Sequence, residues 1–299
     1  MTLSFETVDV FTDTRFGGNP LAVVFGAEGL ATERLQAIAR EFNYSETTFV
    51  LPPEDAANTA RVRIFSTKRE MAFAGHPNVG TAAVIGWRGT LFGRPVGDVL
   101  RFEEIAGLVP VAVERTDGVV TGTTLTAPEP FSRGDAVPVA EVAACLGLTD
   151  ADIRTDRHPP VIGSVGLPFI LAELRDAEAV RRAGPIAARF ADQPAVAANG
   201  AILCYARVDD PEIDIRARMF APIRNVAEDP ATGSACGALM GLLGTLEPGR
   251  GTLTRRIAQG VEMGRPSLLR GAVDHADDAA VAVRIGGRSI PVMSGTIEI

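Results

Sequence analysis

The sequence reads Arg61-Val-Arg-Ile-Phe65 and then FAGHPNVGTAAVIG (residues 73–86), and it repeats this pattern half a chain later. There it reads Arg216-Ala-Arg-Met-Phe220 and then EDPATGSACGALMGLL (residues 228–243). In each copy a strand pattern precedes a nearly uncharged segment, which predicts a helix buried on all sides. Two related half-chains of this kind predict a cleft at their pseudo-symmetric seam, and this cleft is where we expect a functional site.

The pattern outside the repeat predicts a β-rich unit around each buried helix. Strands are expected at 3–11, 20–25 and 46–51, and helices at 32–42 and near 138–147. The Gly286-Gly287 pair predicts a hairpin over 281–294. Because the strand–helix alternation of a doubly wound sheet is missing, we expect an α+β fold. The N-terminal lobe is placed at 1–117 and the C-terminal lobe at 118–291, with a last strand, about 292–299, crossing back to the first lobe.

Composition excludes several classes of function. The net charge of −8 argues against nucleic-acid or anionic-membrane partners, and no apolar run is long enough to span a membrane. The N-terminus lacks the pattern of a signal peptide. Three cysteines without metal or redox spacing fit a cytoplasmic protein with no structural disulfide. No dinucleotide or phosphate-loop motif stands in a suitable context, so a nucleotide-binding fold is not expected.

Both helix starts are candidate ligand sites. Gly75 and His76 open the first helix, while Asp229, Gly233 and Ser234 mark the second. Free N–H groups and the positive end of the helix dipole suit a carboxylate or phosphate. Ordinary capping is the alternative for each start. Asp229 is either a buried carboxyl with a raised pKa that exchanges protons or a helix cap.

Glu46 opens an apolar strand beside Ser45. It is either a loop residue or a buried carboxyl with a raised pKa that exchanges protons near neutral pH. His76 is either structural or a ligand contact, and His158, which precedes two prolines, is expected on a surface loop. The glycine-rich segment 259–267 either grips an anion or shapes a β-bulge. Cys236 is expected to be a small core residue.

Several of these motifs together resemble the phenazine-biosynthesis PhzF family. They are YSETTFV around Glu46, Phe73-Ala-Gly-His-Pro77, Glu228-Asp-Pro-Ala-Thr-Gly-Ser234, Gly264-Arg-Pro-Ser267 and Gly17-Gly-Asn-Pro20. They follow the family's order across essentially the whole chain. The resemblance implies a diaminopimelate-epimerase-like fold, with two pseudo-symmetric lobes that each wrap a β-barrel-like sheet around a central helix. The active site is expected in the cleft between the lobes.

The resemblance also implies an activity and its residues. The best-known activity of the family is isomerisation of trans-2,3-dihydro-3-hydroxyanthranilate without metal or cofactor. Glu46 would be the acid/base that moves a proton between substrate carbons, assisted by His76 and Asp229. Gly233 and Ser234 would hold the substrate carboxylate, with Ser45 and Gly75 also in the binding set. The family usually forms homodimers.

Two alternative functions remain open. Related racemases and epimerases use a cysteine at each helix start, where this sequence has Ala74 and Thr232. Epimerisation or racemisation of an amino acid by two thiols is therefore disfavoured. A non-catalytic small-molecule-binding or regulatory protein is the other alternative, and the presence of Glu46, His76, Asp229 and Ser234 together argues against it.

Overall fold

The computed structural model describes residues 1–276 and 279–299. The chain forms two compact units: unit 1 contains residues 1–126 and 286–299, and unit 2 contains residues 127–285. The boundary expected at 117–118 falls in the turn between two paired strands of unit 1, β9 and β10. Within the described ranges, no helix is long and apolar enough to cross a membrane.

Unit 1 is a sheet that curls around one helix. Its main strands are paired in the order β20–β1–β2–β3–β4–β8–β9–β10, and β5 pairs with β4. Their bounds are β1 Thr2–Val10, β2 Asn19–Phe25, β3 Glu46–Leu51, β4 Ala60–Ser66, β5 Glu70–Met71, β8 Val99–Glu104, β9 Gly107–Thr116, β10 Val119–Thr126 and β20 Ser289–Glu298. A separate small pair is formed by β6 Thr90–Leu91 and β7 Arg94–Pro95.

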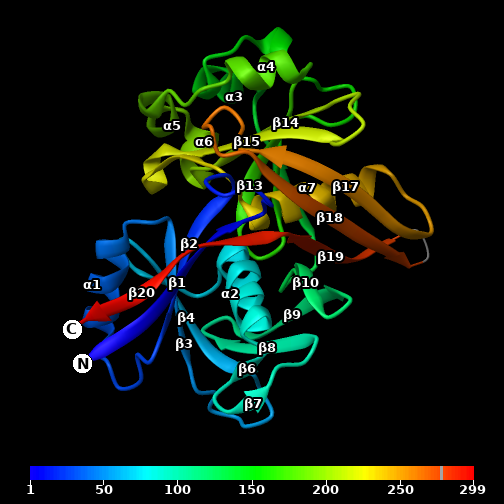
Figure 1. Cartoon of the computed structure of the whole chain (residues 1–299). Coiled ribbons are helices and arrows are strands. Elements are labelled where there is room, and N and C mark those ends of the chain that lie inside the picture. The colour runs from blue at the N-terminus through cyan, green and yellow to red at the C-terminus, as the bar shows by residue number, and fades with distance from the viewer. Residues whose placement is uncertain (277–278) are drawn as a thin grey trace. The chain divides into compact units, whose positions relative to one another are not determined.

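Helix α2, Gly75–Arg88, runs inside this curled sheet (Figure 1). Every residue from Gly75 to Gly86 is buried, as the uncharged sequence predicts. A Cβ at Gly80 would lie 2.6 Å from side-chain atoms of both Leu21 and Val10, so the strands approach the helix closely at that turn. The second helix of the unit, α1 at Thr32–Phe42, packs on β3 and β4 through Leu35 and Ile38.

Unit 2 repeats this connectivity. Its strands pair in the order β11–β12–β13–β14–β15–β17–β18, with β16 on β15. Their bounds are β11 Ser132–Ala136, β12 Val161–Ser164, β13 Pro168–Glu173, β14 Ile202–Arg207, β15 Ile215–Ala221, β16 Val226–Asp229, β17 Gly251–Gln259 and β18 Ser267–Ala276. From β12 to β18 the pairings alternate antiparallel and parallel as they do from β1 to β9. The repeat in the sequence is therefore a repeat of topology.

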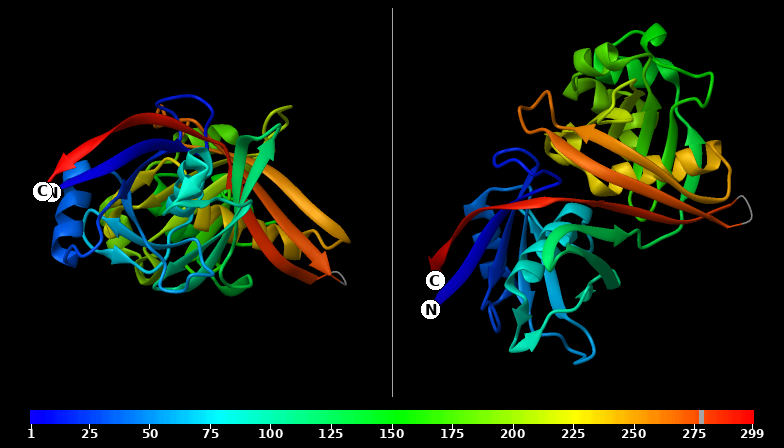
Figure 2. Two further views of the ribbon diagram at one scale, coloured as in Figure 1. Left: turned by 60° about the horizontal axis from the view of Figure 1, so that its bottom comes forward. Right: turned by 45° about the vertical axis from the view of Figure 1, so that its right-hand side comes forward.

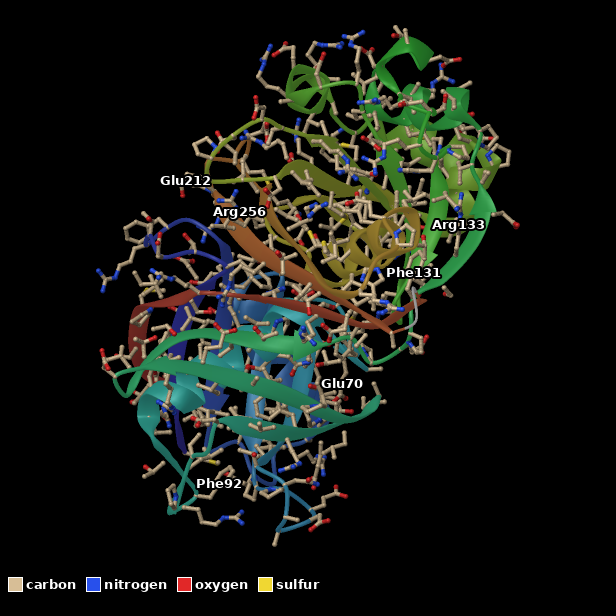
Figure 3. All side chains as sticks on the ribbon, turned by 90° about the vertical axis from the view of Figure 1, so that its right-hand side faces the viewer. Glu70, Phe92, Phe131, Arg133, Glu212 and Arg256 are labelled. Carbon is tan, nitrogen blue, oxygen red and sulfur yellow. The ribbon has the colours of Figure 1, made fainter. Side chains whose placement is uncertain are left out.

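Helix α7, Gly233–Leu246, takes the place in unit 2 that α2 has in unit 1. A Cβ at Gly241 would lie 2.4 Å from the ring of Phe131 (Figure 3), so this helix also packs tightly. The remaining helices are α3 Val139–Leu146, α4 Ala177–Arg182, α5 Ala187–Asp192 and α6 Pro194–Asn199, with short 3-10 turns η1 Asp150–Asp152 and η2 Pro222–Arg224. The helices α3 to α6 share an apolar core with β13 and β14 that includes Phe190 and Ile202.

The hairpin predicted over 281–294 is wrong. Strand β19, Ala279–Gly287, is followed by β20 after one residue, and β20 pairs with β1 along its length (Figure 2). Gly286 does not have the positive φ that a tight hairpin turn requires of glycine. Position 286 has no room for a side chain, because a Cβ there would lie 2.2 Å from Thr124 Oγ1 and 2.6 Å from Thr123 O. The glycine marks a close approach of strands, not a turn.

Candidate active site

Glu46 and His76 lie together in unit 1. Glu46 is the first residue of β3, and His76 is in the first turn of α2. Glu46 Oε2 is 3.5 Å from His76 Nε2, and the two side chains are 19% and 7% exposed. The partial exposure of Glu46 leaves a carboxylate beside a buried imidazole and still within reach of a small molecule. The structure thus brings together two of the three predicted catalytic residues.

Asn19 contacts the other nitrogen of the His76 ring. Its Nδ2 lies 3.4 Å from His76 Nδ1, and the Asn19 side chain is fully buried. Gly18 fixes this position, since its φ is +61° and a Cβ there would lie 2.3 Å from Val10 O. The Gly17-Gly-Asn-Pro20 motif therefore supplies a residue of the site that the sequence analysis did not assign.

The His76 ring is neutral at neutral pH. Burial lowers the pKa of His76 to about 3, and a backbone hydrogen bond with Pro20 only partly opposes this shift. Pro20 has no backbone N–H, so in this bond a ring N–H of His76 donates to the Pro20 carbonyl. A neutral imidazole beside a carboxyl group can orient that group or a polar group of a ligand, and it adds no charge of its own.

The other two candidates of unit 1 flank this pair. Gly75 is buried as the first residue of α2, and Ser45 is half-buried directly before β3. The first N–H groups of an α-helix have no acceptor within the helix, so the start at Gly75 offers donors next to His76.

Asp229, Gly233 and Ser234 lie together in unit 2. Asp229 ends β16 and is 8% exposed, and α7 begins four residues later at Gly233. The hydroxyl of Thr232, the N-cap residue of α7, donates to Asp229 Oδ2 over 2.5 Å. Gly233 is buried and Ser234 half-buried at the start of a 14-residue helix, a suitable place for a carboxylate.

The segment 259–267 holds this turn from the side. Gln259 is fully buried, and its side chain bonds the backbone of Asp229 and Thr232. Ser267 Oγ donates to Pro230 O over 2.9 Å. Gly260 has a φ of +73°, and a Cβ there would lie 2.5 Å from Pro230 O. The segment therefore packs against the turn that carries Asp229 and Pro230, while the choice between an anion site and a β-bulge stays a prediction.

An arginine–glutamate ion pair stands before each central helix. In unit 1, Arg63 on β4 donates to both oxygens of Glu70 on β5, over 2.6 and 2.7 Å. In unit 2, Arg218 on β15 donates to both oxygens of Glu228 on β16, over 2.7 and 2.8 Å. Glu228 precedes Asp229, so the second pair fixes the strand that carries Asp229. These bidentate pairs were not predicted, although both arginines belong to the repeated segment.

The cysteines supply no exposed thiol to these sites. Cys145, Cys204 and Cys236 are all free and buried, and burial raises the pKa of each thiol. Cys236 is a core residue, as predicted, and its thiol donates to Gln259 Oε1. The N-cap residues of α2 and α7 are Ala74 and Thr232, neither of which can act as a thiol.

His158 corrects one expectation. The sequence placed it on a surface loop because two prolines follow, but its side chain is fully buried. Its Nε2 lies 2.7 Å from Tyr205 Oη, and Glu173 Oε2 lies 3.8 Å from the same nitrogen. Burial lowers the pKa of His158. The ring of His158 lies in the core of unit 2, where it forms a polar cluster with Tyr205 and Glu173.

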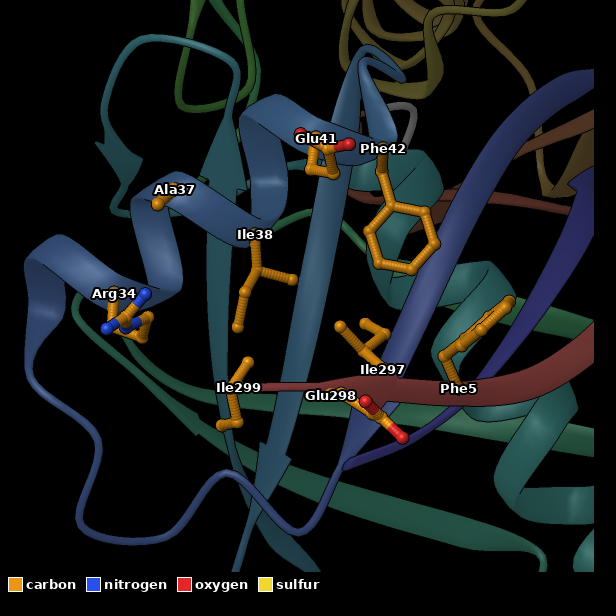
Figure 4. A pocket seen from close by; sticks show the side chains of 9 residues that line it. All are labelled: Phe5, Arg34, Ala37, Ile38, Glu41, Phe42, Ile297, Glu298 and Ile299. Atoms are coloured by element: carbon orange, nitrogen blue, oxygen red, sulfur yellow. The ribbon is translucent and has the colours of Figure 1, made fainter. Parts of the chain in front are cut away.

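A separate hollow of about 270 Å³ lies between α1 and the end of β20 (Figure 4). Its walls include Phe5, Ile38, Phe42 and Ile297, so it is largely apolar. None of the predicted site residues lines it. Over the described ranges, no cluster of three His, Cys, Asp or Glu side chains is arranged to bind a metal.

The comparison with known proteins agrees with the geometry. The model of the phenazine biosynthesis-like protein family matches residues 8–295. The chain belongs to this family. Within the phenazine biosynthesis-like family, an uncharacterised isomerase of Mesorhizobium japonicum is 37% identical, with 100% of this chain and 99% of that protein covered.

A second relative has a named reaction. The trans-2,3-dihydro-3-hydroxyanthranilate isomerase of Pseudomonas aeruginosa is 34% identical, with 97% of this chain and 98% of that protein covered. Among solved structures, the phenazine biosynthesis protein of the PhzF family from Bacillus anthracis matches with a TM-score of 0.88. At 24% identity and full coverage of both chains, this match shows the shared fold. The predicted family, α+β fold and isomerase class are confirmed.

Proposed function

We propose that the protein is a cofactor-independent isomerase that moves a proton on a small carboxylate-bearing metabolite. The substrate class follows the named relative, so trans-2,3-dihydro-3-hydroxyanthranilate is the first compound to test. The observation that supports this most is the Glu46–His76 pair, with the carboxylate partly exposed and the imidazole buried and neutral.

Glu46 is proposed as the acid/base. Its carboxylate accepts a proton from one carbon of the substrate and returns it to another, so the net change is a shift of hydrogen and double bonds. Because the same group takes and returns the proton, no external oxidant, reductant or co-reactant is needed. The neutral His76 ring contacts Glu46 or a polar group of the substrate during the transfer.

Residues at the start of α7 are proposed as further substrate-binding groups. Gly233 and Ser234 at the start of α7 provide N–H donors and the positive end of the helix dipole for the substrate carboxylate. Asp229 contacts a polar group of the substrate and assists proton transfer. In unit 1, Ser45 and Gly75 complete the binding set. We also propose a homodimer, as the family resemblance implies, and a cytoplasmic location, which the cysteine content favours.

Glu46→Gln tests the acid/base role directly. Gln keeps the size and hydrogen-bonding capacity of the side chain but cannot take the proton. We expect deuterium from the solvent to enter trans-2,3-dihydro-3-hydroxyanthranilate with the wild-type protein, and incorporation to fall at least about 1,000-fold in the variant. NMR and mass spectrometry measure the incorporation, and circular dichroism checks that the fold is intact.

Two outcomes contradict this proposal. Unchanged deuterium incorporation in Glu46→Gln would show that Glu46 is not the acid/base. Tight binding of the compound with neither deuterium uptake nor product would favour the alternative of a non-catalytic binding protein. Epimerisation by a thiol pair is disfavoured by the burial of all three cysteines.

A further inference from the structure

The amide of Gln259 has a fixed orientation. Its Oε1 accepts the backbone N–H of Thr232 over 3.2 Å, and its Nε2 donates to the backbone carbonyl of Asp229 over 2.7 Å. A backbone N–H can only donate and a carbonyl can only accept, so these two partners determine which end of the amide is which. Gln259 is also fully buried, which keeps water from competing for these bonds.

The fixed amide sets the direction of the Thr232 hydroxyl. Gln259 Nε2 donates its second hydrogen to Thr232 Oγ1 over 3.1 Å. With the oxygen accepting there, the hydroxyl hydrogen is directed to Asp229 Oδ2, which lies 2.5 Å away. This distance is in the range for a hydroxyl bonded to an ionised carboxylate. Each hydrogen bond is therefore donated in the same direction: Gln259 donates to Thr232, and Thr232 donates to Asp229.

The backbone on either side of Asp229 is fixed by further contacts. Arg218 fixes β16 through Glu228, the residue before Asp229. Ser267 and Gly260 pack against Pro230, the residue after it. The N-cap residue of α2, Ala74, has no hydroxyl, so this arrangement belongs to unit 2 alone.

We infer that Thr232 and Gln259 are positioning residues for Asp229. Their directed hydrogen bonds hold the Asp229 carboxylate as an acceptor in one orientation at the start of α7. The inference rests on the proposed function, in which Asp229 contacts the substrate. Thr232 itself is not assigned a role in the proton transfer.

The test compares Thr232→Val, which keeps the shape but removes the hydroxyl, with Thr232→Ser, which keeps the hydroxyl. With trans-2,3-dihydro-3-hydroxyanthranilate as the probe, we expect kcat to fall about 10- to 100-fold in Thr232→Val, with KM changed less than about threefold. Thr232→Ser is expected to restore kcat to within about threefold of wild type. Thr123→Val is the matched control, because Thr123 is a buried threonine in unit 1 whose hydroxyl bonds Val79 O.

A second measurement does not depend on turnover. In protein labelled with ¹³C at the aspartate carboxyl groups, Asp229→Asn identifies the Asp229 signal. We expect this signal to move in Thr232→Val, to return in Thr232→Ser, and to stay in place in Thr123→Val. An Asp229 signal that is the same in Thr232→Val and wild type overturns the inference, as does a kcat in Thr232→Val equal to that of Thr123→Val.

The two measurements separate this inference from the proposed function. If wild type neither exchanges deuterium nor forms product, but the Asp229 signal moves in Thr232→Val, the directed hydrogen bonds stand and the proposed isomerase function fails.

Discussion

Two neighbouring glutamates on β8 have opposite environments. Glu103 accepts hydrogen bonds from the backbone of Glu54 and Asp55 and from the amide of Asn58, and the Asn58 bond contributes most to lowering its pKa. Both carboxyl oxygens of Glu104 are buried and, among the described residues, have no partner in hydrogen-bonding geometry. Burial raises the pKa of Glu104 to about 8, although the nearby amide of Asn78 partly offsets this.

Glu104→Gln is therefore expected to change how stability depends on pH. In the folded protein Glu104 stays protonated up to about pH 8, whereas in the unfolded chain it ionises near pH 4.5. The folded state thus binds the extra proton between these values, and its stability falls as pH rises through them. Gln resembles the protonated acid and does not ionise, so the variant does not lose stability through this position as the pH rises. We expect the variant to gain roughly 2 to 5 kcal/mol over wild type between pH 5 and pH 8, measured by urea unfolding.

Glu103→Gln is the matched control on the same strand. Since the pKa of Glu103 is lowered on folding, its contribution to stability is present above its unfolded pKa and is lost as pH falls. Its replacement is expected to destabilise the protein at pH 8, the opposite sign to Glu104→Gln. Equal effects of the two substitutions would contradict the assignment of the raised pKa to Glu104.

At the residue level, the sequence predicts which residues belong to the candidate site better than it predicts their contacts. Glu46, His76 and Asp229 were assigned through motifs, and the structure brings Glu46 to 3.5 Å from His76. Their catalytic roles remain proposals. Gln259 was named but its role stayed open, because its partners lie 27 and 30 residues away in the chain and depend on the position of β17.

At the level of elements, the buried helices were predicted well because their signal is local. A run without charges can only be stable inside a core, and α2 and α7 begin within one residue of the predicted starts. The strand at Gly286 was misinterpreted for the opposite reason. Glycine serves turns and close approaches alike, and the choice between them depends on Thr123 and Thr124, which lie far away in the sequence.

Gly80→Ala tests how tightly the sheet encloses α2. An added methyl would have to displace Leu21 and Val10, since both come within 2.6 Å of the new Cβ. Overpacking of this kind costs about 1 to 3 kcal/mol, and we expect a corresponding loss in the free energy of unfolding. Gly97→Ala is the control, because nothing lies within 4 Å of a Cβ there. A Gly80→Ala protein as stable as Gly97→Ala would show that the strands yield to the helix.

At the scale of the whole molecule, the repeat explains the architecture but not the chemistry. Both units share one order of strand pairing, and both have an arginine–glutamate pair before the central helix. Their helix starts differ, with His76 and Ala74 in one and Thr232 and Ser234 in the other. The proposed acid/base, Glu46, lies outside both copies of the repeat.

The proposed homodimer is tested on the intact protein. Light scattering coupled to size-exclusion chromatography is expected to give twice the mass of the chain across a tenfold range of concentration. A mass equal to one chain throughout that range would contradict it. Fractionation of the native host's cells tests the proposed cytoplasmic location.

Strand β20 has a consequence for how the protein is made. It pairs with β1 from Ser289 to Glu298, and Met1 and Ile299 exchange backbone hydrogen bonds over 3.1 and 2.9 Å (Figure 2). During synthesis β1 can pair with β2 early, but its other neighbour, β20, is made only after the whole of unit 2. Unit 2 is contained in residues 127–285 and is complete before then. Unit 1 is thus finished after unit 2, and Glu46 and His76 belong to unit 1.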